Sequence, residues 1–120
     1  MNELKLREVV MLTEKNAIAV RLKEPFLKWL ENIDNMTDII EAGREWSIYI
    51  IPSLVMFDDE TIEEYLKENY RKIFATELCM WYTEPEMWPE EISYEKFREW
   101  FEIEMHDAVF DIEKREKDIF

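Results

Sequence analysis

Hydrophobic and polar residues alternate along short segments of the N-terminal half, as they do in β-strands. Every second residue of 17–23 is apolar, whereas Arg21 and Lys23 lie on the opposite face of the predicted strand. Residues 47–51 are apolar on both faces, which indicates an interior strand or one that is covered on both sides. Residues 6–12 are apolar and β-branched enough to form a further strand. The N-terminal half is therefore expected to form a small sheet.

Two shorter segments of this half have helical spacing instead. Pro25 suits the first position of a helix, where its missing N–H is no loss, and apolar residues then recur at helical intervals to residue 33. Residues 37–42 predict one more helical turn, which Gly43 ends. Short helices are thus expected between the strands.

The C-terminal half predicts two long helices. The helix 58–82 begins at Asp58, a good N-cap residue, and carries apolar residues at intervals of three and four. The helix 93–111 likewise follows a serine that can cap it. The connection between the two predicts a single helical turn, because Thr83 and Glu86 stand at capping-box spacing.

These segments together predict an α+β fold. We expect a small, mainly antiparallel sheet from the N-terminal half, packed against the two long C-terminal helices 58–82 and 93–111. The 120 residues fit a single acidic domain, 1–120, in which the charged residues 112–120 are expected to fray.

Acidic residues are concentrated in the second half of the chain. The protein carries 29 Asp and Glu against 15 Lys and Arg, a formal net charge of −14 at pH 7. Residues 1–57 contain nine acids and seven bases, whereas residues 58–120 contain twenty acids and eight bases. A field of one sign favours a cationic partner, such as a basic protein, and disfavours nucleic acid.

No segment predicts export or membrane insertion. The longest apolar run, residues 46–57, is shorter than the ~20 residues that span a bilayer. No apolar core follows a basic N-terminal start, so we expect a soluble cytoplasmic protein without a membrane partner. The single cysteine, Cys79, lies in an apolar stretch and is expected to be a small buried residue.

The sequence has no motif for a cofactor or for catalysis. Gly43 is the only glycine, which excludes the glycine-rich loops that bind phosphate. Neighbouring carboxylates such as those of Glu63 and Glu64 point about 100° apart on a helix and do not converge as catalytic acids must. We therefore predict a non-enzymatic protein without a cofactor.

His106, the only histidine, is the basis of an alternative function. Glu102 stands one helical turn before it and Glu99 precedes both, so these side chains could hold a metal or serve a carboxylate-dependent enzyme. A histidine that is hydrogen-bonded or half exposed beside Glu102, without a ligand role, is the simpler interpretation.

Aromatic and acidic residues are interleaved between the two predicted helices. We predict that Tyr82, Glu84, Glu86, Trp88 and Glu91 contact a basic protein partner, as in an inhibitor, an immunity-type protein or an adaptor. Trp88, Tyr82, Glu84 and Glu86 also suit a small-cation binder, such as one for a polyamine, because aromatic rings and carboxylates can hold an ammonium group. In the third interpretation, these aromatic residues pack the corner between the helices.

Packing and capping residues that together form a recognisable pattern are distributed over residues 17–112. They are Pro25-Phe26, Trp29-Leu30, Asp58-Asp59-Glu60, Tyr65-Leu66-Lys67-Glu68-Asn69-Tyr70, Ile73-Phe74, Trp88-Pro89, Phe97, Trp100-Phe101, His106 and Val109-Phe110-Asp111. This pattern resembles a family of short, acidic bacterial proteins of unknown function, although residues 53–57 are longer than expected for that family. The resemblance implies a bacterial, soluble, single-domain protein and implies no catalytic residue.

Overall fold

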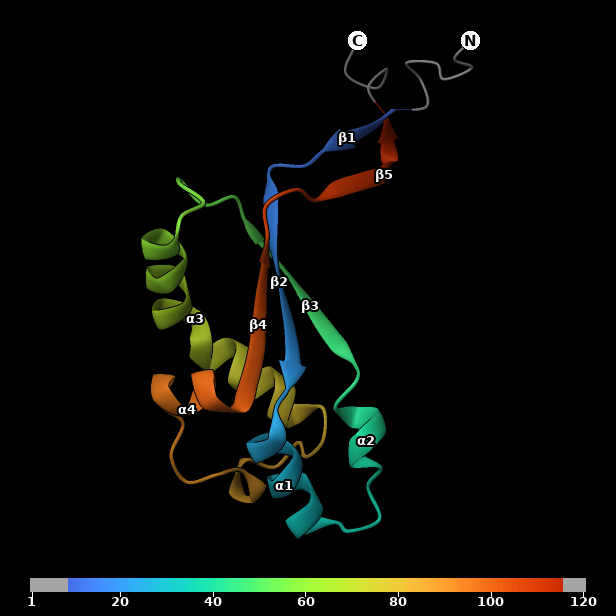
Figure 1. Ribbon diagram of the computed structural model, residues 1–120, viewed down its shortest axis with the longest axis vertical. Coiled ribbons are helices and arrows are strands. Elements are labelled where there is room, and N and C mark those ends of the chain that lie inside the picture. Colours follow the sequence, from blue (N-terminus) through green and yellow to red (C-terminus); the bar gives the residue numbers. More distant parts are fainter. Residues whose placement is uncertain (1–8, 116–120) are drawn as a thin grey trace.

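The computed structural model describes residues 9–115. In chain order its elements are β1 (Val10–Leu12), β2 (Lys15–Leu22), α1 (Glu24–Ile33), α2 (Ile39–Ala42), β3 (Trp46–Pro52), α3 (Asp59–Cys79), a 3-10 helix (Pro85–Met87), α4 (Tyr94–Trp100), β4 (Phe101–His106) and β5 (Phe110–Arg115) (Figure 1). The fold is therefore α+β, with strands in both halves of the chain.

The strands form two small antiparallel sheets. The larger sheet has three strands in the order β3-β2-β4, and β1 pairs with β5 in the smaller one. Because β1 precedes β2 and β5 follows β4, the smaller sheet leaves the larger one as a two-stranded arm (Figure 1). Asn16 fixes this junction, since its buried side chain donates to the Asp107 backbone oxygen at 2.9 Å and accepts from the Leu54 N–H at 2.8 Å.

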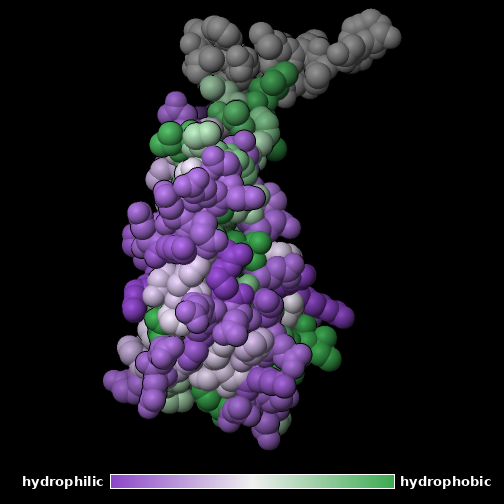
Figure 2. All heavy atoms as spheres, turned by 60° about the vertical axis from the view of Figure 1, so that its left-hand side comes forward, coloured by the Kyte–Doolittle hydropathy of each residue, from purple (hydrophilic) through white to green (hydrophobic). Residues whose placement is uncertain are grey.

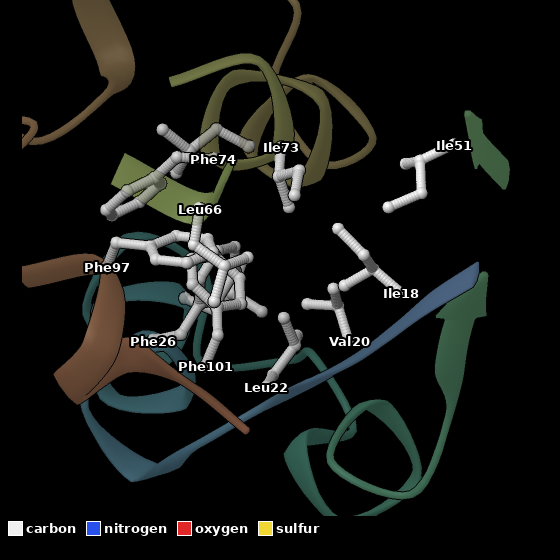
Figure 3. Close-up of a cluster of buried hydrophobic side chains, with 12 residues drawn as sticks. Ile18, Val20, Leu22, Phe26, Ile51, Leu66, Ile73, Phe74, Phe97 and Phe101 are labelled. Atoms are coloured by element: carbon white, nitrogen blue, oxygen red, sulfur yellow. The ribbon is translucent and has the colours of Figure 1, made fainter. Parts of the chain in front are cut away.

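One face of the larger sheet packs against α3 to form the core. Ile18 and Val20 of β2 point toward Ile73 of α3, Phe74 of the same helix lies on the side of Phe97, and these side chains are all buried (Figure 3). Three further aromatic side chains, from α1, α4 and β4, close the same cluster: Phe26, Phe97 and Phe101. Burial of this cluster is the main stabilising contribution of the fold.

Several sequence predictions are confirmed. Residues 17–22 of the alternating segment 17–23 lie in β2, residues 47–51 lie in β3, and Pro25 sits in the first turn of α1. Asp58 caps α3 by accepting a hydrogen bond from the Thr61 N–H at 2.8 Å, which satisfies a free donor of the first turn.

The second long C-terminal helix was wrongly predicted. Ser93 does cap α4, but that helix ends at Trp100 and the chain continues as β4 and β5. From Phe101 onward, apolar and charged residues alternate with a period of two, which fits a strand better than a helix. Residues 112–115, part of the segment expected to fray, belong to β5. Cys79 is exposed, not buried, because it faces away from the core at the end of α3.

Candidate functional site

The strand β3 exposes apolar side chains on the sheet face that points away from α3. The exposed fraction is 61% for Ile48, 69% for Ile50 and 36% for Trp46. The prediction that this strand is interior or covered on both sides was wrong for residues 9–115, among which β3 is an edge strand with one uncovered face. Its alternate residues Tyr49 and Ile51 pack against the core, so only half of the apolar pattern is used internally.

Cross-strand pairing places three rows of side chains on this open face. The rows are Trp46–Arg21–Glu102, Ile48–Ala19–Glu104 and Ile50–Ala17–His106, each running from β3 across β2 to β4. The two alanines of β2 are buried, at 5% for Ala17 and 3% for Ala19. The open face therefore has an apolar side on β3, small residues along the middle and charged residues on β4.

The two edges of the three-stranded sheet differ in chemistry. On the open face, β4 presents Glu102, Glu104 and His106, which are exposed and charged or polar. β3 presents no charged residue on this face. Its last residue, Pro52, has no N–H to donate to a neighbouring strand, but the other residues of β3 do. Natural proteins protect free strand edges with charges, bulges or covering segments. Among residues 9–115, β3 has a strand neighbour on the β2 side alone, and its outer edge lacks such charges.

Arg21 closes one end of the open face. Its guanidinium carbon lies 4.5 Å from the centre of the Trp46 ring, and its Nη2 lies 2.5 Å from a carboxylate oxygen of Glu102. This side chain thus connects β3 to β4 across the sheet. Ile48 and Ile50 remain outside this contact, so the uncovered apolar surface begins beyond it.

The apolar surface continues from β3 toward the arm. A groove of about 840 Å³ lies at the arm, and Ile50 is the residue of β3 that lines it. Its other lining residues include charged ones, Glu14, Lys15, Asp111 and Lys114, and apolar ones, among them Leu12, Phe110 and Ile112. The last three are more than half exposed. Figure 2 shows hydrophobic residues gathered on the arm, whereas the surface over α3 and α4 is mostly hydrophilic.

The predicted partner-binding residues lie at the other end of the molecule, after α3. Tyr82 and Trp88 are half buried. The Trp88 Nε1–H donates to the Tyr82 backbone oxygen at 2.7 Å, and the rings of Tyr82 and Trp29 form a T-shaped pair with their centres 5.8 Å apart. These contacts hold the connection against the core. Glu84, Glu86 and Glu91 are exposed beside them. The predicted single helical turn is present at Pro85–Met87, although Thr83 does not cap it. A partner at these residues stays a prediction.

The predicted metal-ligating residues are spread along different elements. Glu102 and His106 lie on β4 and not on a helix, so four residues of strand, about 13 Å, separate them. Glu102 pairs with Arg21, His106 contacts Glu104 at 2.6 Å, and Glu99 is exposed on α4. Within residues 9–115, no three His, Cys, Asp or Glu side chains are grouped as metal ligands.

Sequence reasoning missed Ile48 and Ile50 as functional candidates. The signal was present, because residues 47–51 are apolar on both faces and thus resemble a strand with two covered faces. The chain supplies a cover for one of these faces.

Comparison of the chain with protein-family models, curated proteins and solved structures found no match. The resemblance to short acidic bacterial proteins therefore stays a prediction. None of the helices within residues 9–115 is both long enough and apolar enough to cross a bilayer.

Proposed function

We propose that this protein is a non-enzymatic binding module that accepts an extended segment of a basic partner protein along β3. The observation that supports it is that, within residues 9–115, β3 has a free edge and carries two exposed isoleucines, Ile48 and Ile50, on its open face. An extended segment that pairs with such an edge gains main-chain hydrogen bonds, and its alternate side chains pack on the exposed face.

The energetic gain is concentrated in two side chains. Complete burial of an isoleucine stabilises by about 1.5–3 kcal/mol. Since Ile48 and Ile50 are 61% and 69% exposed, covering both would contribute about 2–4 kcal/mol. Backbone pairing along β3 would fix the direction and register of the bound segment.

The charge of the protein selects a cationic segment. The exposed carboxylates Glu102 and Glu104 lie on β4, about 14 Å from a segment that pairs with the outer edge of β3, so they attract a basic segment through their field and not by direct contact. The net charge of −14 adds long-range attraction for a basic partner. A second copy of this chain would bring the same negative charge, so electrostatic repulsion disfavours it as the occupant.

A selection from a library of displayed peptides tests the proposal without a known partner. Peptides are selected on the wild type, and their dissociation constants are then measured for two double variants. The first is Ile48→Lys with Ile50→Lys. The matched control is Met36→Lys with Ile40→Lys, which adds the same charge at residues that are 87% and 69% exposed.

We expect enriched peptides that alternate apolar residues with Lys or Arg. Their binding should weaken at least about tenfold in the β3 variant and less than about twofold in the control. It should also weaken as salt concentration rises, because exposed charges are then screened. Failure to enrich any peptide, or equal binding by the two variants, would overturn the proposal.

A further inference from the structure

A second site lies on the other side of β3, where α2, the start of β3 and the end of α3 meet. A cavity of about 540 Å³ opens there. Its lining includes four carboxylates and two large apolar side chains: Asp38, Glu41, Glu45, Glu77, Met80 and Trp81. No Lys, Arg or His of the described chain lines it.

Glu77 is the buried carboxylate of this cavity, with 3% of its surface exposed. Its hydrogen-bond partners are the neutral hydroxyl groups of Tyr49 and Ser47. Within residues 9–115, none of the ion pairs includes this residue. A buried carboxylate without a cation is costly, and a cationic ligand in the cavity would supply the missing charge.

The end of α3 adds a second independent preference for positive charge. This helix spans 21 residues, and its last turn carries no basic residue. The carboxyl end of a helix has a partial negative charge from its unpaired carbonyl groups. Glu77, Met80 and Trp81 line the cavity and lie in or just after the last turn of α3, so the cavity is beside the negative end of this helix.

Trp81 supplies an aromatic surface at the rim. The residue is 38% exposed. Four aromatic rings of the described chain have a Lys or Arg over them, and the Trp81 ring is not one of these. An indole face attracts an organic cation, above all where carboxylates stand nearby.

The arrangement of the carboxylates in this cavity favours an organic cation over a metal ion as the ligand. In the part of the chain that the structure describes, these acids form no group of three that could hold a metal. A cation with an apolar stem matches them better, because Met80 and Trp81 can pack against the stem while carboxylates meet the charged end. We propose that this cavity binds an alkylguanidinium or alkylammonium group, with Glu77 at its buried end and Trp81 against its stem.

An alkylguanidinium or alkylammonium group can belong to a protein side chain or to a free polyamine, and a titration distinguishes these two ligands. N-acetyl-arginine amide represents a protein side chain, spermidine represents a free polyamine, and N-acetyl-glutamine amide is the neutral control. Binding is followed by NMR through the indole N–H signal of Trp81, with affinities from calorimetry. The cavity is distinct from the open face of β3, so this test is independent of the peptide selection.

Variants assign the binding to the cavity. Glu41→Gln with Glu45→Gln removes two exposed carboxylates from the rim, and Glu84→Gln with Glu86→Gln removes two exposed carboxylates elsewhere. We expect at least one cation to bind, with affinity reduced about tenfold or more in the rim variant and less than about twofold in the control. Trp81→Leu, which keeps every charge, should also weaken binding.

Preference for the arginine derivative would identify a partner side chain as the natural ligand, and preference for spermidine would identify a free polyamine. The proposal is overturned if neither cation binds, if the neutral amide binds equally well, or if both double variants lose the same affinity. Circular dichroism of each variant checks that the fold is retained, and Trp81→Leu provides the test if the rim variant does not fold.

Discussion

The hydroxyl group of Tyr49 on β3 donates a hydrogen bond to the carboxylate of Glu77 on α3. This bond joins the covered face of the sheet to the long helix, at a strand whose other face is open. Burial, and then the hydrogen bond with its partner, raises the pKa of Tyr49. Burial also raises the pKa of Glu77, against the opposite effect of the hydrogen bonds from Tyr49 and Ser47.

Tyr49→Phe is expected to destabilise the fold. The substitution leaves a buried carboxylate with one donor fewer, which should lower the free energy of unfolding by about 1–3 kcal/mol. Urea denaturation measures this difference. Tyr82→Phe is the matched control, because no hydrogen bond of the Tyr82 hydroxyl is found among the described residues. Equal losses in the two variants would show that the bond to Glu77 contributes nothing specific.

Glu77→Gln should change how stability depends on pH. The pKa of Glu77 is raised above its ordinary value of 4.5, so the folded protein holds this proton more tightly than the unfolded chain does. The contribution of this group to stability is therefore fully present below that value and is lost as the pH rises through the raised pKa. The variant does not undergo this loss.

The free energy of unfolding of Glu77→Gln, relative to that of the wild type, should thus increase as the pH is raised from acid to neutral. Urea denaturation at a series of pH values gives the curve. Glu84→Gln, an exposed control, should show no comparable trend. A difference between Glu77→Gln and wild type that stays constant with pH would contradict the raised pKa.

Ile48→Lys with Ile50→Lys should leave the folded chain nearly as stable as the wild type. These side chains are largely exposed, and exposed substitutions usually change stability by less than about 0.5 kcal/mol each. Ile18→Ala, in the adjacent strand but fully buried, should cost about 2–5 kcal/mol. Thermal and urea denaturation compare them. A large loss in the exposed double variant would mean that these isoleucines serve the fold and not a partner.

Trp88→Phe separates the two proposed partner surfaces. It removes the indole N–H that donates to the Tyr82 backbone oxygen, which should cost about 0.5–1.5 kcal/mol of stability. The affinity for peptides selected on the wild type should not change, because the β3 face is made by other residues. Weaker peptide binding by this variant would instead support the surface around Tyr82.

Sequence patterns predicted the elements in which local and tertiary preferences agree. Apolar and polar residues alternate in β2, which pairs with a strand on each side. Asp58 is a residue type that favours the N-cap position, and its side chain does cap α3. The β4 strand was missed because Phe97, Phe101 and Met105 also stand at helical spacing. Pairing with β2 along the full length of β4 decides in favour of the strand, and such pairing involves residues 79 to 89 positions apart.

The candidate site was predictable only in part. The apolar character of 47–51 on both faces was visible in the sequence, but which face the protein covers depends on where α3 packs. The cavity beside Glu77 forms where residues 37–47 meet residues 77–81, about 30 positions later in the chain, so no local pattern could indicate it. By contrast, Tyr82 and Trp88 stood out locally, and the structure shows that their rings pack against the core cluster.

Hydrogen exchange of the β3 amides, with and without a selected peptide, tests the central proposal most directly. Alternate N–H groups of residues 46–51 point away from β2 and should exchange with solvent in the free protein. An added strand should slow the exchange of those groups, while amides of the opposite edge strand β4 keep their rates. Unchanged exchange along β3, or protection confined to β4 or to residues 80–93, would contradict the account.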